Sequence, residues 1–200
     1  MDIKTRSILF AQILDANSGY FPIADIEKRG IDRIYAYDWL AEQTGIQKLT
    51  KGLYARKDIE LDPFYVLAYG HKNIVFSHTS ALCLNGLISD IPLQQCVTVI
   101  TGYNVKEINH KCRVFQTKPE LHQMGTEEIW TKWNHKVHVY NKEKTICDMI
   151  RREKYFGDDL LRDALKNFFS DPKRDIERLI FYGEKLKIKQ KLYPYIKMMN

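Results

Sequence analysis

The stretch GYFPIADIEKRGIDRIYAYDWLAEQTGIQKLTKGLYARK, residues 19–57, decides the fold of the first part of the chain. Pro22 suits the start of a short helix, because its missing N–H is not needed in a first turn, and Gly30 suits the end of that helix. Asp32 suits the N-cap of a second helix over residues 33–43, since its carboxylate can accept the free N–H groups of the first turn. A helix, a short turn and a capped helix predict a helix-turn-helix.

Two strand-like runs follow, at residues 46–49 and 53–56, and the turn between them contains Gly52. This pattern predicts a small hairpin, the wing of a winged helix. An apolar stripe at helical spacing predicts a further helix over residues 3–15. We therefore expect a winged helix-turn-helix domain over residues 1–58. Winged helices also dock on proteins, so this pattern alone leaves a role without DNA open.

From residue 59 to residue 200 the pattern predicts a second domain that mixes helices and strands and ends in a helical bundle. Helices are expected over residues 62–68 and 77–86, and strands at 73–76, 96–100, 112–116, 128–132 and 136–140. Further helices are expected from near Glu143, from Asp158 or Asp159, after Pro172 and near the C-terminus. Pro194 is expected to break or kink the last of them. The predicted fold class is α+β with two domains.

Charge is uneven along the chain, whose 200 residues carry a net charge of +6. Residues 1–60 contain nine basic and nine acidic residues, whereas residues 141–200 contain fifteen and ten. The basic excess therefore lies outside the predicted winged helix. No apolar run reaches the roughly 18 residues that span a bilayer. The first residues also lack the uninterrupted apolar segment of a signal peptide, so we expect a cytoplasmic protein without a membrane partner.

The sequence makes no positive case for an enzyme, a metal site or a cofactor. Ser77 and His78 resemble a catalytic dyad, but no nucleophile elbow is present, and a helix N-cap followed by a first-turn residue explains them better. The pair His135 and His138 has no evident third ligand. The four cysteines are scattered without a C-x-x-C pair and are expected to be core residues: Cys83, Cys96, Cys112 and Cys147.

Three ordered segments carry a family resemblance: VFSHTSALCLNGL at residues 75–87, VTVITGYN at 97–104 and VYNKEKTICDMIR at 139–151. They are similar to the segments FSH-x-x-AL-x-L-x-GL, VTV-x-x-GYN and VY-x-x-E-x-TICD-x-x-R of AbiE-type abortive-infection antitoxins. The resemblance extends to Gly52 and Tyr54, where the family carries its wing. Pro194 and the sparse basic charge of residues 33–43 depart from the family pattern.

The resemblance implies the antitoxin of a type IV toxin–antitoxin system in phage defence. It implies a partner toxin of nucleotidyltransferase type, which the antitoxin counteracts without forming a stable complex with it. It also implies that the N-terminal domain represses its own promoter by binding inverted repeats, which have room for a dimer. The match marks the following residues as part of the fold, without implying that they are catalytic: Ser77, His78, Gly102, Tyr103, Asn104, Thr145, Cys147 and Asp148.

Two helical registers are open for the helix over residues 33–43. One faces Ala36, Trp39, Leu40 and Gln43 inward and turns four residues toward base edges: Arg33, Ile34, Tyr37 and Asp38. The other buries Ile34, Tyr37 and Ala41 and exposes Tyr35, Trp39 and Glu42, a poorer surface for a polyanion. In either case the basic residues of the wing would contact phosphates: Lys48, Lys51, Arg56 and Lys57.

The basic residues of the last sixty positions suggest a surface for antitoxicity, because such a surface could compete for a nucleic-acid substrate of the toxin. Its candidates are Arg151, Arg152, Lys154, Arg162, Lys166, Lys185, Lys187, Lys189 and Lys191. For any single one, a solvated side chain that serves solubility is the simpler interpretation.

Two rival functions stay open. A stand-alone winged-helix transcription factor would use its second domain for sensing or dimerisation. A nucleic-acid-modifying enzyme would use Ser77, His78 and the basic surface.

Overall fold

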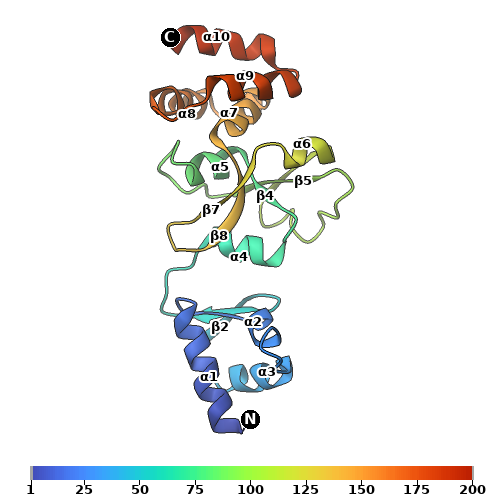
Figure 1. The fold of residues 1–200 in the computed structure, drawn as a ribbon, viewed down its shortest axis with the longest axis vertical. Coiled ribbons are helices and arrows are strands. Elements are labelled where there is room, and N and C mark those ends of the chain that lie inside the picture. The colour runs from blue at the N-terminus through green and yellow to red at the C-terminus, as the bar shows by residue number, and fades with distance from the viewer. Residues whose placement is uncertain (1, 200) are drawn as a thin grey trace. The chain divides into compact units, whose positions relative to one another are not determined.

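The computed structural model describes residues 2–199 and has a mixed α+β fold (Figure 1). The chain divides after Lys72 into two compact units. Each unit has its own sheet and its own buried apolar clusters. Each unit positions a different set of the predicted site residues.

The first unit begins with three helices around one apolar cluster. They are α1 (Ile3–Ala16), α2 (Ile23–Glu27) and α3 (Arg33–Ala41). The cluster contains Phe10 of α1, Ile26 of α2 and Leu40 of α3. The expected N-cap of α3 is confirmed, since Asp32 Oδ1 accepts a hydrogen bond of 2.9 Å from Ile34 N–H. Gly30 has φ +72°, a left-handed conformation that suits glycine and ends α2 as expected.

The sheet of the first unit has three antiparallel strands in the order β1-β3-β2. They are β1 (Tyr20–Pro22), β2 (Ile46–Thr50) and β3 (Leu53–Arg56). The expected hairpin is therefore present as β2 and β3, and Gly52 in its turn has φ +75°. Tyr20 pairs with Ala55, so the short extended segment before α2 forms a third strand beside the hairpin.

The helix α4 (Pro63–Gly70) packs against this sheet and belongs to the first unit. The Tyr69 hydroxyl donates a hydrogen bond of 3.0 Å to the Gly52 carbonyl, and the Tyr20 hydroxyl accepts one of 2.7 Å from Asp62 N–H. The sequence placed the boundary after residue 58, but the structure places the division after Lys72. The reason is tertiary: the aromatic side of α4 covers one face of the sheet.

The second unit is built on a mixed sheet of five strands in the order β6-β5-β4-β8-β7. The strands are β4 (Val75–Phe76), β5 (Cys96–Ile100), β6 (Arg113–Thr117), β7 (Thr126–Trp130) and β8 (Lys136–Tyr140). The strand β4 is short but central, since Phe76 pairs with Val97 of β5 and with Val139 of β8. The predicted strands are present, with β7 two residues earlier than expected.

Helices α5 (His78–Leu84), α7 (Lys142–Arg151), α8 (Asp158–Ser170), α9 (Ile176–Lys185) and α10 (Lys189–Met199) share an apolar core (Figure 1). Ile146, Phe168 and Leu179 are fully buried in it. The expected helical end of the chain is thus present. Helix α10 runs through Pro194 without a break, so a break at this proline is not seen.

Two short elements have no counterpart in the sequence analysis: α6 (Pro119–Gln123) and the 3₁₀ helix η1 (Glu153–Tyr155). Neither contains a fully buried residue. A short segment without a buried face has no apolar periodicity, and periodicity was the signal on which the helices were predicted.

Candidate functional site

Helix α3 presents the face that the first of the two registers predicts. Its inward side holds the buried Ala36 and Leu40 and the half-buried Trp39. The helix ends at Ala41, earlier than expected, so the half-buried Gln43 follows it. Its exposed side carries the four residues expected to approach base edges: Arg33, Ile34, Tyr37 and Asp38. The second register, which buries Ile34 and Tyr37, is wrong.

The exposed face of α3 carries little positive charge of its own. Arg33 Nη1 lies 3.8 Å from Glu27 Oε1, and both side chains are exposed. The guanidinium of Arg6, from α1, stacks on the ring of Tyr35 at 3.8 Å from its centroid. Exposed ion pairs contribute little to the free energy of folding. Arg33 can therefore leave Glu27 and bind another anion. The sequence analysis missed Arg6, because only the packing of α1 brings it beside α3.

The β2–β3 hairpin carries the four basic residues expected to contact phosphates, but two of them have partners. Arg56 forms an ion pair with Asp15 of α1, and Lys57 Nζ donates a hydrogen bond of 2.7 Å to the Thr44 carbonyl. Lys48 and Lys51 are exposed and form no ion pair within residues 2–199. The hairpin surface open to a polyanion therefore centres on Lys48 and Lys51.

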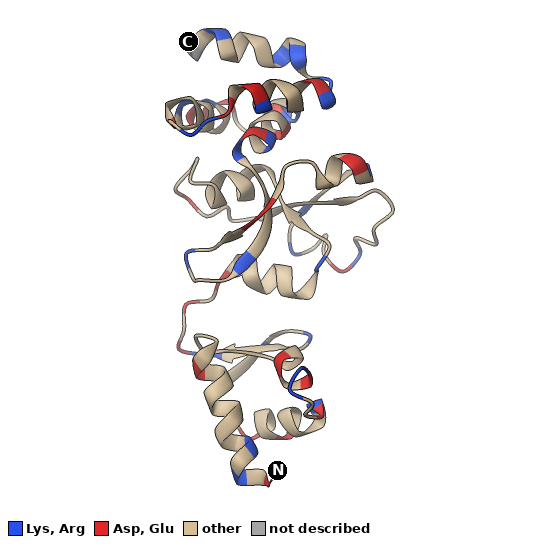
Figure 2. Cartoon of the chain, viewed as in Figure 1, with Lys and Arg blue, Asp and Glu red and all other residues tan. Residues whose placement is uncertain are grey.

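The nine basic candidates of the second unit do not form one free cationic surface. Three are paired with carboxylates: Arg162 with Asp159, Lys189 with Glu184, and Lys191 with Glu153. Figure 2 shows basic and acidic segments interspersed over α7, α8 and α9, whereas α10 has basic segments alone. Four others are exposed and unpaired within the described chain: Arg151, Lys154, Lys166 and Lys187. Lys185 lies 5.4 Å from the ring of Phe181.

Arg151 and Arg152, at the end of α7, line a small pocket within the second unit. His78 from the start of α5, Thr98 from β5 and Asp148 from α7 line the same pocket. Of the residues that carry the family resemblance, the fold thus brings His78 and Asp148 to one place. Cys147 points elsewhere, into the apolar core, where its thiol lies 3.5 Å from the Leu179 carbonyl.

The role expected of Ser77 is only partly correct. Ser77 occupies the N-cap position of α5, but its side chain makes no capping hydrogen bond. Its hydroxyl lies 2.9 Å from His78 Nδ1 and 2.9 Å from the hydroxyl of Thr98. Ser77 is fully buried, so it cannot attack a substrate in solution. It instead holds the imidazole ring of His78.

His78 is buried between aromatic rings. The ring of Phe115 stacks on it at 3.7 Å between centroids, and that of Phe156 lies 5.4 Å away. Burial lowers the pKa of His78 to about 4, because the charged imidazolium would lose its hydration. The Asp148 carboxylate opposes this shift, whereas the cations Lys144 and Arg152 add to it. His78 is therefore neutral near pH 7.

A buried ion pair forms one wall of the pocket. Lys144 Nζ donates a hydrogen bond of 2.5 Å to Asp148 Oδ2, one helical turn away on α7. The two side chains are only 3% and 9% exposed. The ammonium group also lies 4.1 Å from the centre of the Tyr140 ring. Each of these buried charges is stabilised by the other. The ion pair therefore fixes the positions of Lys144 and Asp148 at the inner end of the pocket.

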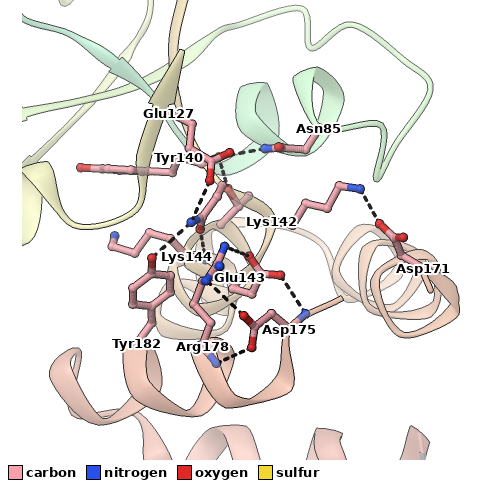
Figure 3. A network of polar contacts seen from close by, with 12 residues as sticks. Asn85, Glu127, Tyr140, Lys142, Glu143, Lys144, Asp171, Asp175, Arg178 and Tyr182 are labelled. Atoms are coloured by element: carbon pink, nitrogen blue, oxygen red, sulfur yellow. Dashed lines mark hydrogen bonds and ion pairs between the residues drawn. The ribbon is translucent and has the colours of Figure 1, made fainter. Parts of the chain in front are cut away.

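The opposite end of α7 is fixed by a buried polar network (Figure 3). Asn141 Oδ1 accepts a hydrogen bond of 3.0 Å from Lys144 N–H, and Asn141 Nδ2 donates one of 3.2 Å to the Tyr182 hydroxyl. Glu143 Oε1 accepts one of 3.1 Å from Asp175 N–H. Asp175 and Tyr182 belong to α9 and its start. The network therefore joins the start of α7 to α9 by hydrogen bonds. It thereby fixes the orientation of α7, whose other end bears Arg151 and Arg152.

The sequence analysis missed Thr98 and Lys144 as pocket residues. Thr98 stands in a strand that reads as an ordinary buried run, and Lys144 reads as a solvated lysine near a helix start. A lysine and an aspartate four residues apart on one helix face were the only local signal.

Within residues 2–199, no group of three or more His, Cys, Asp or Glu side chains is placed to hold a metal ion. The described helices include none with the length and apolar character needed to cross a membrane.

The pH dependence of stability should report the burial of His78. The unfolded chain takes up a proton near pH 6.5, whereas the folded chain resists it until about pH 4. The free energy of unfolding should therefore be highest above pH 6.5 and fall by about 3 kcal/mol as the pH drops toward 4. His78→Asn is the matched variant, because asparagine tolerates the left-handed φ of +49° at this position. Urea denaturation of both proteins between pH 7 and pH 4.5 should show the smaller pH effect in the variant. Equal slopes would contradict the assignment.

Comparisons with known proteins identify a fold but no family. No family model and no curated protein matches this sequence. Among solved structures, the chain is similar to the RV2827C protein from Mycobacterium tuberculosis, with a TM-score of 0.52 and 12% sequence identity. The similarity covers 94% of this chain and 79% of the other. At this identity the similarity concerns the fold alone.

Proposed function

We propose that this chain is the antitoxin of an AbiE-type, type IV toxin–antitoxin system. In this proposal the first unit is a winged helix-turn-helix that represses the shared promoter. The second unit opposes a nucleotidyltransferase-type toxin without forming a stable complex with it.

One observation carries the proposal. The three segments that resemble AbiE-type antitoxins are far apart in sequence, yet they contribute β4, β5 and β8, which are neighbours at the centre of one sheet. The first segment continues into α5 and the third into α7, and the two helices pack in one core. Motifs that converge in space are better support for a family than motifs that match only in order.

The first unit supports the DNA-binding half of the proposal. Helices α2 and α3 are joined by a short turn and followed by the β2–β3 hairpin. The face of α3 with Arg33 and Tyr37 is exposed, and Tyr37 lies 6.4 Å from the ring of Tyr54 in the hairpin. One small unit offers few phosphate contacts, so paired half-sites of an inverted repeat would raise its affinity.

Binding to an inverted repeat upstream of its own gene tests this half of the proposal. Fluorescence anisotropy with that duplex and with a shuffled duplex, over a range of salt concentrations, is the measurement. We expect tighter binding to the inverted repeat, and we expect Arg33→Ala to lower discrimination at one base pair by about 1 to 3 kcal/mol. Equal affinity for the two duplexes would contradict specific repression.

Two lysine variants then test the hairpin. Lys51→Ala should weaken binding to every sequence and reduce the slope of log K against log salt by about 0.9, because one phosphate contact is lost. Lys57→Ala removes the same charge, but the Thr44 carbonyl already holds that ammonium group, so its effect should be smaller. If the two variants behave alike, the hairpin does not meet DNA in the way we propose.

The pocket beside His78 favours one second candidate, a stand-alone transcription factor whose second unit senses a small ligand. The reading frame next to the gene separates the two, since a neighbouring toxin gene would argue against a stand-alone factor.

A further inference from the structure

The pocket at the end of α7 has unbalanced charge. Lys144 and Asp148 neutralise each other, while Arg151 and Arg152 have no carboxylate within 4.0 Å among the described residues. Two guanidinium groups at the mouth of one pocket attract an anion, and their planar donors suit the oxygens of a phosphate. Arg151 is exposed and Arg152 is half-buried, and two such arginines alone do not make a binding site.

The interior offers a neutral hydrogen-bond donor. The hydroxyl of Thr98 donates to Ser77, and the hydroxyl of Ser77 can then donate to His78 Nδ1, with both oxygen and nitrogen contacts at 2.9 Å. With Nδ1 as an acceptor, the neutral ring carries its proton on Nε2. No described residue hydrogen-bonds to Nε2, and His78 is 3% exposed. The ring therefore has a nearly buried N–H group with no partner in the fold.

The backbone at His78 has an uncommon conformation, which the surrounding side chains have to stabilise. His78 has φ +49°, a left-handed conformation that is uncommon for residues other than glycine, although asparagine, aspartate and histidine adopt it more often than the rest. Such strain persists where the surrounding structure imposes it, and it is frequent at ligand sites. Here the stacked rings of Phe115 and Phe156 and the hydrogen bond from Ser77 impose it.

The size of the pocket limits the ligand. Its volume of about 20 Å³ has room for one small polar group at a time, and not for a nucleobase. The ring of Tyr155, which is exposed, lies 5.7 Å from the guanidinium of Arg152, outside the pocket. A ligand that places one oxyanion inside and an aromatic group outside would fit both features.

We propose that this pocket binds the terminal phosphate of a nucleotide, with Arg151 and Arg152 holding the oxygens at the mouth and His78 Nε2–H donating to the innermost one. The ligand chemistry is that of a phosphate monoester, which both a free nucleoside 5′-phosphate and the 5′ end of a nucleic-acid strand carry. The pocket would bind it whether or not the protein restrains a toxin, so this inference and the proposed function can fail separately.

Isothermal titration of the full chain tests the proposal with three probes: inorganic phosphate, a nucleoside 5′-monophosphate, and a short oligonucleotide with either a 5′-phosphate or a 5′-hydroxyl. We expect at least one phosphate monoester to bind, and the double variant Arg151→Ala with Arg152→Ala to weaken it at least about tenfold. The matched control is Lys173→Ala with Arg174→Ala, which removes two neighbouring exposed cations from the loop before α9 and should bind as the wild type does.

A second variant tests the interior of the pocket. His78→Asn keeps a polar group near Ser77 but removes the Nε2 donor, so it should also weaken the phosphate, with the fold checked by circular dichroism. Binding of the monophosphate identifies a free nucleotide as the source, whereas binding of the 5′-phosphorylated oligonucleotide alone identifies a strand end.

Three results would overturn the proposal. The first is no binding of any phosphate monoester by the wild type at millimolar concentration. The second is equal binding of the 5′-phosphorylated and 5′-hydroxyl oligonucleotides with no binding of the smaller probes. The third is equal loss of binding in the Lys173 and Arg174 control.

Discussion

Asp148→Ala is expected to lower the free energy of unfolding by about 3 to 5 kcal/mol, the largest effect of any single change predicted here. The substitution leaves the ammonium group of Lys144 buried without its carboxylate, and that side chain is only 3% exposed. An uncompensated buried charge costs far more than a lost surface contact. Urea denaturation near pH 7 measures the difference.

A matched control exists on a neighbouring helix. Arg162 and Asp159 form an ion pair of the same length, 2.5 Å, but its side chains are 69% and 85% exposed. Asp159→Ala should therefore cost less than about 1 kcal/mol, because water screens the pair. The double variant Lys144→Met with Asp148→Leu should recover much of the loss, since it removes both charges together. Similar costs for Asp148→Ala and Asp159→Ala would mean that the pair on α7 is more hydrated than the structure indicates.

The second large effect is expected when the two units are expressed separately, because we propose that only the second unit counteracts the toxin. If the proposed antitoxin function is correct, residues 73–200 alone should rescue cells from the proposed toxin, and residues 1–72 alone should give no rescue. The structure supports the use of these fragments, because the chain divides after Lys72 and each unit buries its own apolar cluster. A fragment cut after residue 58 would separate α4 from the sheet on which it packs. Co-expression with the neighbouring toxin is the measurement, and circular dichroism shows whether each fragment is folded.

Charge reversal locates the surface that carries the rescue. Arg151→Glu with Arg152→Glu should abolish rescue if the end of α7 competes for a nucleic-acid substrate of the toxin. Lys173→Glu with Arg174→Glu makes the same change of charge on another exposed segment and should keep rescue. A folded second unit that fails to rescue would contradict the division of labour. Rescue that survives both reversals would leave that division intact and contradict the electrostatic mechanism.

Much of the first unit could be predicted from local residues. The N-cap at Asp32 depends on a side chain and an N–H group two residues apart, and the turn at Gly52 depends on one residue that tolerates a positive φ. The outward face of α3 follows from the helical repeat of its apolar residues. The boundary was placed too early because α4 is held to the sheet by contacts such as Tyr69 to Gly52, which local patterns do not contain.

The sequence by itself determined most of the helices and strands, the α+β class and the family resemblance, because caps, turns and apolar repeats act over a few residues. Only the tertiary structure decided which charges are free. Arg56 meets Asp15 across 41 positions, Lys191 meets Glu153 across 38, and Lys144 is buried although a lysine near a helix start is ordinarily solvated. The environment of a side chain depends on what the fold packs against it, so the pocket of His78, Thr98 and Asp148 becomes visible only when three distant segments meet.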